Sequence, residues 1–216
     1  PMNILYNYSL AYLYYTNNKF ELAENIINKI LDLDENNTSA ISLKIIFLSN
    51  KNEAAEAGKL ISKLKNLENK DDFMYYAISV YYWNLNIWDK AILNINKAIE
   101  LNNKSIEYKF ALAQYYYNSL NFENSIKVCN EIIGLNPKYI QAYILNAKNF
   151  IKENNLQEAL KYAEEAKTLD INSDEVYYIK GIIELKFNKL KEAIENFKTA
   201  LSISPFKEIY YALTAE

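Results

Sequence analysis

Apolar and polar residues alternate along this chain with a helical period, and the whole pattern recurs six times at one fixed step. A small residue marks each copy, and apolar residues follow it four, seven and ten positions later. These spacings place the side chains on one face of a helix. A small residue in that face lets a second helix approach closely. The six markers are Ala23, Ala57, Ala91, Ser125, Ala159 and Ala193.

A second helical stretch precedes each marker. Small residues are frequent twelve positions before it, and bulky residues recur nine positions before it in five of the six copies. We therefore predict an all-α chain of helical hairpins, with the first pair near 4–16 and 19–32 and the others following at the step of the markers. The residues nine positions before the markers are Tyr14, Leu48, Tyr82, Tyr116, Phe150 and Glu184.

This pattern resembles the tetratricopeptide repeat, a helical hairpin of about 34 residues with characteristic residues at fixed places. The last copy matches that pattern at Tyr177, Gly181, Ala193, Phe197 and Pro205. The resemblance implies a right-handed α-α superhelix, a solenoid that forms a single array over residues 4–216. Its repeats are 4–37, 38–71, 72–105, 106–139, 140–173 and 174–207, and a terminal helix follows at 208–216.

Some positions depart from the family pattern. Lys44, Asn146 and Lys180 stand where the family has Leu, and the second copy is the most degenerate, so we expect it to deviate most in geometry. Asn often stands where the family has Gly at the end of the first helix, a place that needs a positive φ. These residues are Asn18, Asn52, Asn86, Asn154 and Asn188, and the fourth copy has Leu120-Asn121 instead.

The composition leaves little room for catalytic chemistry. The chain has no His, only 3 Gly and a single Cys, which excludes a Ser-His-Asp site, an HExxH zinc site and a Gly-rich phosphate loop. Cys129 lies on the apolar face and is predicted to be a packing residue. Asp71 is predicted to cap a helix, and other carboxylate pairs to be solvated helix charge. We expect no enzyme activity, no cofactor and no metal.

The net charge of the chain limits the classes of partner that it is expected to bind. The net charge is −3 and there is no Arg, so nothing favours nucleic acid. No apolar run approaches the roughly 18 residues that span a bilayer, so we expect no membrane insertion. The lone Cys and the lack of a signal segment favour a cytoplasmic location. Abundant Asn, Ile, Lys and Tyr indicate an AT-rich genome.

The resemblance also implies a binding surface, because first helices line the concave side of such arrays. The positions that would point into this groove are rich in aromatic residues and carry three charges, Glu107, Lys148 and Asp174. An apolar surface of this kind marks an interaction site. The alternative is that Tyr is merely abundant, or that tight winding buries some of the rings. The candidate partner-binding residues are Tyr8, Tyr12, Tyr15, Phe73, Tyr76, Trp83, Phe110, Tyr117 and Tyr178.

The resulting prediction is a protein-protein interaction scaffold that binds a peptide or a protein in this groove. We expect Tyr76, Trp83, Phe110 and Tyr117 to lie side by side and to contribute most to the binding of a partner. The clamp that some tetratricopeptide repeats form around a C-terminal carboxylate is rejected, because Tyr8 and Tyr12 stand where it needs Lys and Asn. Two alternatives remain: a docking or regulatory segment of a larger protein whose catalytic domain lies outside this chain, and self-association through open array ends.

Overall fold

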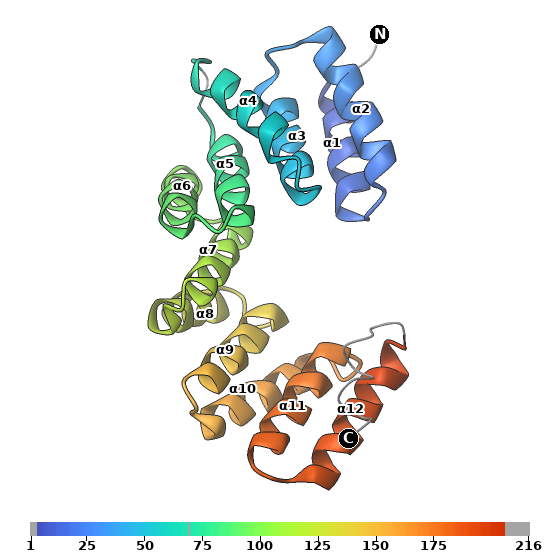
Figure 1. Ribbon diagram of the computed structural model, residues 1–216, viewed down its shortest axis with the longest axis vertical. Helices are drawn as coiled ribbons and strands as arrows, with labels where there is room; N and C mark the ends of the chain where they lie inside the picture. Colours follow the sequence, from blue (N-terminus) through green and yellow to red (C-terminus); the bar gives the residue numbers. More distant parts are fainter. Residues whose placement is uncertain (1–3, 69, 206–216) are drawn as a thin grey trace. The chain divides into compact units, whose positions relative to one another are not determined.

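The computed structural model describes residues 4–68 and 70–205, and within these residues the chain forms α-helices and no strand (Figure 1). The helices follow one another as six hairpins, each made of a first helix, a short turn and a second helix. The first helices are α1 (Ile4–Thr16), α3 (Thr38–Asn50), α5 (Asp72–Asn84), α7 (Ile106–Asn118), α9 (Ile140–Lys152) and α11 (Asp174–Lys186). The second helices are α2 (Phe20–Leu33), α4 (Ala54–Lys65), α6 (Trp88–Leu101), α8 (Phe122–Leu135), α10 (Leu156–Leu169) and α12 (Leu190–Ile203).

The all-α prediction is confirmed, and the first predicted pair agrees with α1 and α2 within one residue. The second repeat deviates: α4 has 12 residues where every other second helix has 14. The predicted helix at 208–216 lies outside the described residues.

A residue with left-handed backbone ends the first helix of every hairpin. Its φ lies between 57° and 63° in all six. The following residue donates its N–H to the carbonyl oxygen five residues earlier at 2.8–2.9 Å, which satisfies a carbonyl that would otherwise lack a partner at the helix end. Five of these residues are the predicted Asn, and the fourth is Leu120: Asn18, Asn52, Asn86, Leu120, Asn154 and Asn188.

Side-chain caps begin several helices. Asp71 caps α5 as predicted, because its Oδ1 accepts a hydrogen bond from the N–H of Met74 at 2.7 Å. Asn37 caps α3 in the same way, accepting from Ala40 at 3.0 Å. Each cap satisfies one of the free N–H groups of a first turn.

The chain divides into two compact units, Pro1–Tyr108 and Lys109–Glu216, and the division falls inside α7. Each unit is a stack of hairpins and is described by itself. The continuity of all six hairpins as one array stays a prediction.

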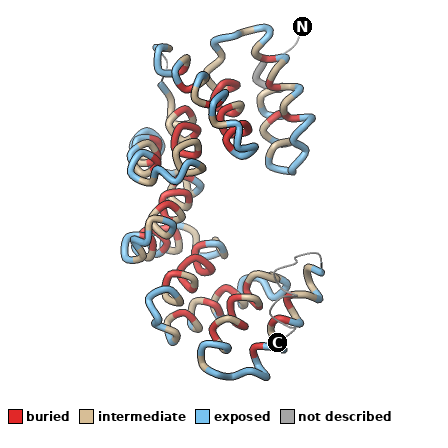
Figure 2. Tube along the Cα trace, in the orientation of Figure 1, coloured by how far each residue is buried: buried red, intermediate tan, exposed pale blue. Residues whose placement is uncertain are grey.

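The core of the first unit surrounds α3. This helix is buried on almost every side from Ala40 to Ser49, with Lys44 as the exception (Figure 2). The cluster next to it joins Ile41 and Ile45 of α3 to Ile61 of α4 and Ile78 of α5. A helix that is apolar all round is stable only in such surroundings.

The core of the second unit joins α9, α10 and α11. Ile144 and Ala147 of α9 pack with Ala159 of α10 and Ile183 of α11. All six markers of the repeat are at most 1% exposed, so the packing face read from the sequence is the observed one. Gly181 of α11 lies directly against the ring of Phe197, and an added Cβ would overlap that ring.

The polar residues that depart from the family pattern bond to the preceding hairpin. Each lies thirteen residues before its marker and reaches a polar residue five positions after the previous marker. The three pairs are Lys44 Nζ with Asn28 Oδ1 at 2.7 Å, Asn146 Nδ2 with Asn130 Oδ1 at 2.9 Å, and Lys180 Nζ with Glu164 Oε1 at 2.7 Å.

Candidate functional site

The nine candidate partner-binding residues divide between the units. All nine are half-buried. The first unit holds Tyr8, Tyr12 and Tyr15 on α1 and Phe73, Tyr76 and Trp83 on α5; the second unit holds Phe110 and Tyr117 on α7 and Tyr178 on α11.

In the first unit the rings form a packed layer. The Phe73 ring centroid lies 6.1 Å from that of Tyr8 and 6.4 Å from that of Tyr12, with edge-to-face geometry in both pairs. Phe73 also lies 6.1 Å from Tyr76, which stacks on Tyr108 at 5.0 Å. Such pairs contribute about 0.5–1.5 kcal/mol beyond their buried area. The rings of repeats one and three therefore support each other across repeat two.

The composition of repeat two explains this contact. At two groove positions where both neighbouring repeats carry rings, α3 has Ser42 and Ser49, and short side chains leave room for rings from both sides. Ser42, Ile46 and Ser49 are consequently buried. These three side chains are therefore covered and offer no surface to a ligand, because α3 packs between its neighbours.

Burial keeps two hydroxyl groups of this layer, those of Tyr8 and Tyr108, protonated. Burial is the main cause that raises the pKa of Tyr108, and the negative charge of Asp72 is the second cause. The Tyr108 O–H donates a hydrogen bond to Asp72 Oδ2 at 3.1 Å. Burial also raises the pKa of Tyr8, with smaller contributions from Tyr12 and from the nearby carboxylates. These tyrosines therefore act as apolar surface and hydrogen-bond donors and do not supply a phenolate near neutral pH.

A row of amides runs beside the rings. Asn84 Nδ2 donates to Asn50 Oδ1 at 3.1 Å, and Asn50 Nδ2 donates to the Tyr15 hydroxyl. Asn50 and Asn84 occupy the same place in successive repeats, and Lys152 and Lys186 take that place in the fifth and sixth repeats. No sequence-based prediction included this position, although its regular spacing is visible in the sequence.

The second unit has an open pocket between first helices, with a volume of about 310 Å³. Tyr117 of α7, Ile151 of α9 and Tyr178 and Ile182 of α11 form its apolar wall. The pocket therefore brings together two of the nine candidates, Tyr117 and Tyr178.

Lysines surround the same pocket. Lys148, Lys152 and Lys186 line it. Lys148 Nζ pairs with Glu175 Oε1 at 2.6 Å, whereas no ion pair joins Lys152 or Lys186 to a carboxylate within residues 4–68 and 70–205. Of the three lysines, only Lys148 is among the groove positions predicted from the sequence.

Cys129 has the predicted packing role. It is fully buried on α8, and burial raises the pKa of its thiol to about 12. Ser125, which replaces the usual Ala marker, donates its hydroxyl to the carbonyl oxygen of Ala113 and accepts from Asn149 Nδ2, both at 2.9 Å. A thiol with so high a pKa is a poor nucleophile at neutral pH.

The sequence profile of the tetratricopeptide repeat matches residues 5–37 and 174–207, which are the first and last hairpins. The chain carries tetratricopeptide repeats. The four hairpins between them share the helical arrangement, and departures such as Lys44 and Asn146 weaken their sequence signal. Tetratricopeptide repeats generally form protein-protein interaction scaffolds and are typically not catalytic.

Solved structures show the same fold. A chain of the APC/C hetero-tetramer Cut9-Hcn1 has a TM-score of 0.78 at 15% identity, over 98% of this chain and 42% of its own length. A tetratricopeptide repeat protein from Parabacteroides merdae has a TM-score of 0.74 at 20% identity, over 99% of this chain and 84% of its own. YrrB, a repeat protein with an unusual peptide-binding site, has a TM-score of 0.60 at 17% identity, over 86% and 96%. These likenesses confirm the predicted solenoid of helical hairpins.

No curated protein matches the sequence. Within the described part of the chain, no helix is both long and apolar enough to cross a membrane.

Proposed function

We propose that this chain is a non-catalytic scaffold that binds a peptide segment of a partner protein in the concave pocket of its second unit. The observation that carries the proposal is the 310 Å³ pocket, which three successive first helices line with aromatic, aliphatic and basic side chains. Its volume lies at the lower end of the range for ligand sites. Self-association and a docking role inside a larger protein stay as alternative predictions.

The repeat favours an extended chain as the ligand. The pocket side chains come from α7, α9 and α11, which belong to three successive repeats. The contacts that they offer therefore recur along the array, and the side chains of an extended peptide also recur along its length. Tyr117 and Tyr178 supply rigid rings of the kind that anchor partners. The peptide-binding site of YrrB, which shares this fold, supports the proposal.

The lysines favour an acidic ligand. Lys152 and Lys186 are exposed at the pocket, and an incoming carboxylate would gain charge-assisted hydrogen bonds from them. We therefore expect a peptide with apolar side chains next to Asp or Glu. Its binding should weaken with salt, because exposed charges are screened over about 10 Å at 0.1 M ionic strength.

Selection of peptides from a random library on the immobilised chain tests the proposal. We expect enriched peptides that combine apolar and acidic residues, and we expect Lys152→Glu with Lys186→Glu to weaken their binding by about tenfold or more. Both lysines are exposed, so helical content should not change.

The matched control is Lys191→Glu with Lys198→Glu on α12, which reverses two exposed charges outside the pocket. Binding should survive in this control. Equal losses in both variants, or enrichment of peptides without acidic residues, would count against a basic peptide pocket.

A further inference from the structure

A second pocket lies on another side of the first-unit helices. It has a volume of about 330 Å³ and is lined by residues of α4, α5 and α6 and by Lys70, which lies between α4 and α5. On α5 it uses Tyr75, Ile78 and Tyr82, which follow one another by three and four residues and so share one face. The groove positions Tyr76 and Trp83 lie on a different face of α5, so this pocket is separate from the predicted groove.

The early end of α4 opens this pocket. α4 stops at Lys65, two residues before the point where the other second helices end. It also packs on α5 less extensively than α2 packs on α3 or α10 on α11. The missing half turn leaves Met74 and Ile78 of α5, both buried residues, at the floor of a hollow beside α6.

Four lysines line the hollow, and no acidic residue does: Lys65, Lys70, Lys90 and Lys97. In the described part of the chain no ion pair joins any of them to a carboxylate. The acids at the start of α5 are engaged elsewhere: Asp71 accepts from the N–H of Met74, and Asp72 accepts from Asn102 and Tyr108.

Aromatic rings hold two of these lysines over the hollow. Lys90 Nζ lies 5.3 Å from the Tyr82 ring centroid, and Lys97 Nζ lies 5.4 Å from that of Tyr75. A cation over a ring is stabilised at an exposed site, which restricts where the ammonium groups go. A bound anion would interact favourably with the positive charges that line the hollow.

We propose that this pocket binds a phosphate monoester attached to a small apolar group. Lysine binds phosphate as a point charge, and a phosphate supplies close to two negative charges and three strong acceptor oxygens. Tyr75, Tyr82 and Leu93, which line the pocket and are not buried, offer apolar surface for the attached group. The phosphate would come either from a phosphorylated side chain of a partner protein or from a free small molecule. The site stands apart from the proposed peptide pocket, and either can fail without the other.

Nucleic acid fits this arrangement poorly. The lysines surround one hollow of about 330 Å³, whereas a polynucleotide needs a basic track with repeated contacts to phosphates. The chain as a whole carries a net charge of −3.

Titration of the isotope-labelled protein with phenyl phosphate, followed by amide NMR shifts at constant ionic strength, tests the proposal. We expect saturable shifts confined to residues around 65–97, and none with phenol. Lys90→Gln with Lys97→Gln should weaken binding by about tenfold or more, because two charge-assisted contacts are lost.

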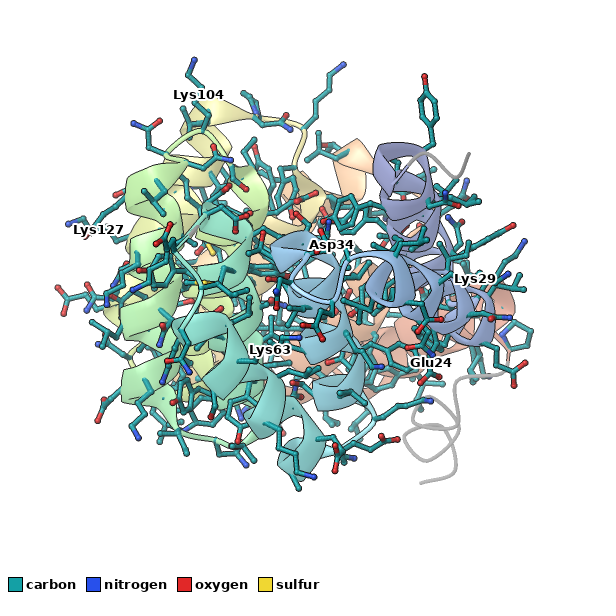
Figure 3. All side chains as sticks on the ribbon, turned by 90° about the horizontal axis from the view of Figure 1, so that it is seen from above. Glu24, Lys29, Asp34, Lys63, Lys104 and Lys127 are labelled. Carbon is teal, nitrogen blue, oxygen red and sulfur yellow. The ribbon has the colours of Figure 1, made fainter. Side chains whose placement is uncertain are left out.

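The matched control is Lys29→Gln with Lys127→Gln, which removes the same charge from exposed positions outside the pocket; Lys127 extends outward from α8 (Figure 3). Lys29 holds the same place in its repeat as Lys97. Binding should be unchanged in this control. Absent or non-saturating shifts in the unaltered protein, or equal losses in both variants, would overturn the proposal. Circular dichroism of each variant checks that it is folded.

A second titration separates the two sources of the phosphate. A short peptide with one phosphotyrosine and its unphosphorylated form are added in place of phenyl phosphate. Tighter binding of the phosphopeptide than of phenyl phosphate supports a phosphorylated partner, and equal or weaker binding supports a free small molecule. Equal binding of the two peptide forms would contradict the phosphate proposal.

Discussion

Single residues at the turns show how one backbone requirement is met by different side chains. A residue with positive φ follows every first helix, and five of these six are Asn. Asn tolerates this conformation because its short polar side chain bonds locally. Leu120 has no such compensation: its φ is 63° and it is 73% exposed. It gains little from burial and carries the strain of a left-handed residue.

Replacing Leu120 with Asn should therefore stabilise the protein. The left-handed conformation costs an ordinary residue about 1–2 kcal/mol, and Asn relieves part of it. We expect a higher midpoint in urea, measured by circular dichroism. Asn86→Leu, the reverse change at the equivalent turn of repeat three, should lower the midpoint. Opposite signs for both variants would mean that side-chain contacts and not backbone strain decide these turns.

Neighbouring helices pack closely at the small marker residues. At three junctions between successive hairpins, one polar pair adds a further contact. The pairs Asn28–Lys44, Asn130–Asn146 and Glu164–Lys180 each join a second helix to the next first helix. At the same place, α5 and α7 carry the apolar residues Ile78 and Leu112. A hairpin stacked on the wrong neighbour would leave a polar group without its partner, and this cost disfavours incorrect stacking.

Enlarging a marker residue should destabilise the hairpin that contains it. Ala91 and Ala159 are both 0% exposed, so Leu at either position forces the two helices apart. Overpacking typically costs about 1–3 kcal/mol. Urea denaturation of Ala91→Leu and Ala159→Leu measures the loss, and Ala55→Leu, at an exposed position of α4, is the control. Unchanged midpoints for both markers would show that the packing face is wrongly assigned.

Across the molecule, aromatic residues serve two purposes. In the first unit, Phe73 contacts both Tyr8 and Tyr76, and these rings pack on the core. In the second unit, Tyr117 and Tyr178 line an open pocket. The rings on the first helices therefore form a packed layer in the first unit, whereas two of those in the second unit line a pocket. The expected alignment of Tyr76, Trp83, Phe110 and Tyr117 spans both units and stays a prediction.

Truncating the rings one at a time tests this division of roles. Tyr76 stacks on Tyr108 at 5.0 Å, and Phe110 packs against Tyr139 at 5.4 Å. Tyr76→Ala and Phe110→Ala should each lower the free energy of unfolding by about 0.5–3 kcal/mol, because each loses a packed ring. Tyr6→Ala, at a ring residue that is 72% exposed, should have little effect. Midpoints that match the unaltered protein for Tyr76→Ala and Phe110→Ala would assign both rings to binding alone.

The helices, the turns and the packing face follow from the sequence, because they depend on periodicity and on local backbone preference. The markers, the left-handed Asn residues and the Asp71 cap are all readable at fixed spacings. Which rings are covered depends instead on tertiary packing, since the serines of α3 let neighbouring helices share one aromatic layer. The pocket that the four lysines line also depends on tertiary packing. Lys65 and Lys97 belong to different repeats, and they meet because α4 ends early and leaves a hollow that the repeat pattern does not encode.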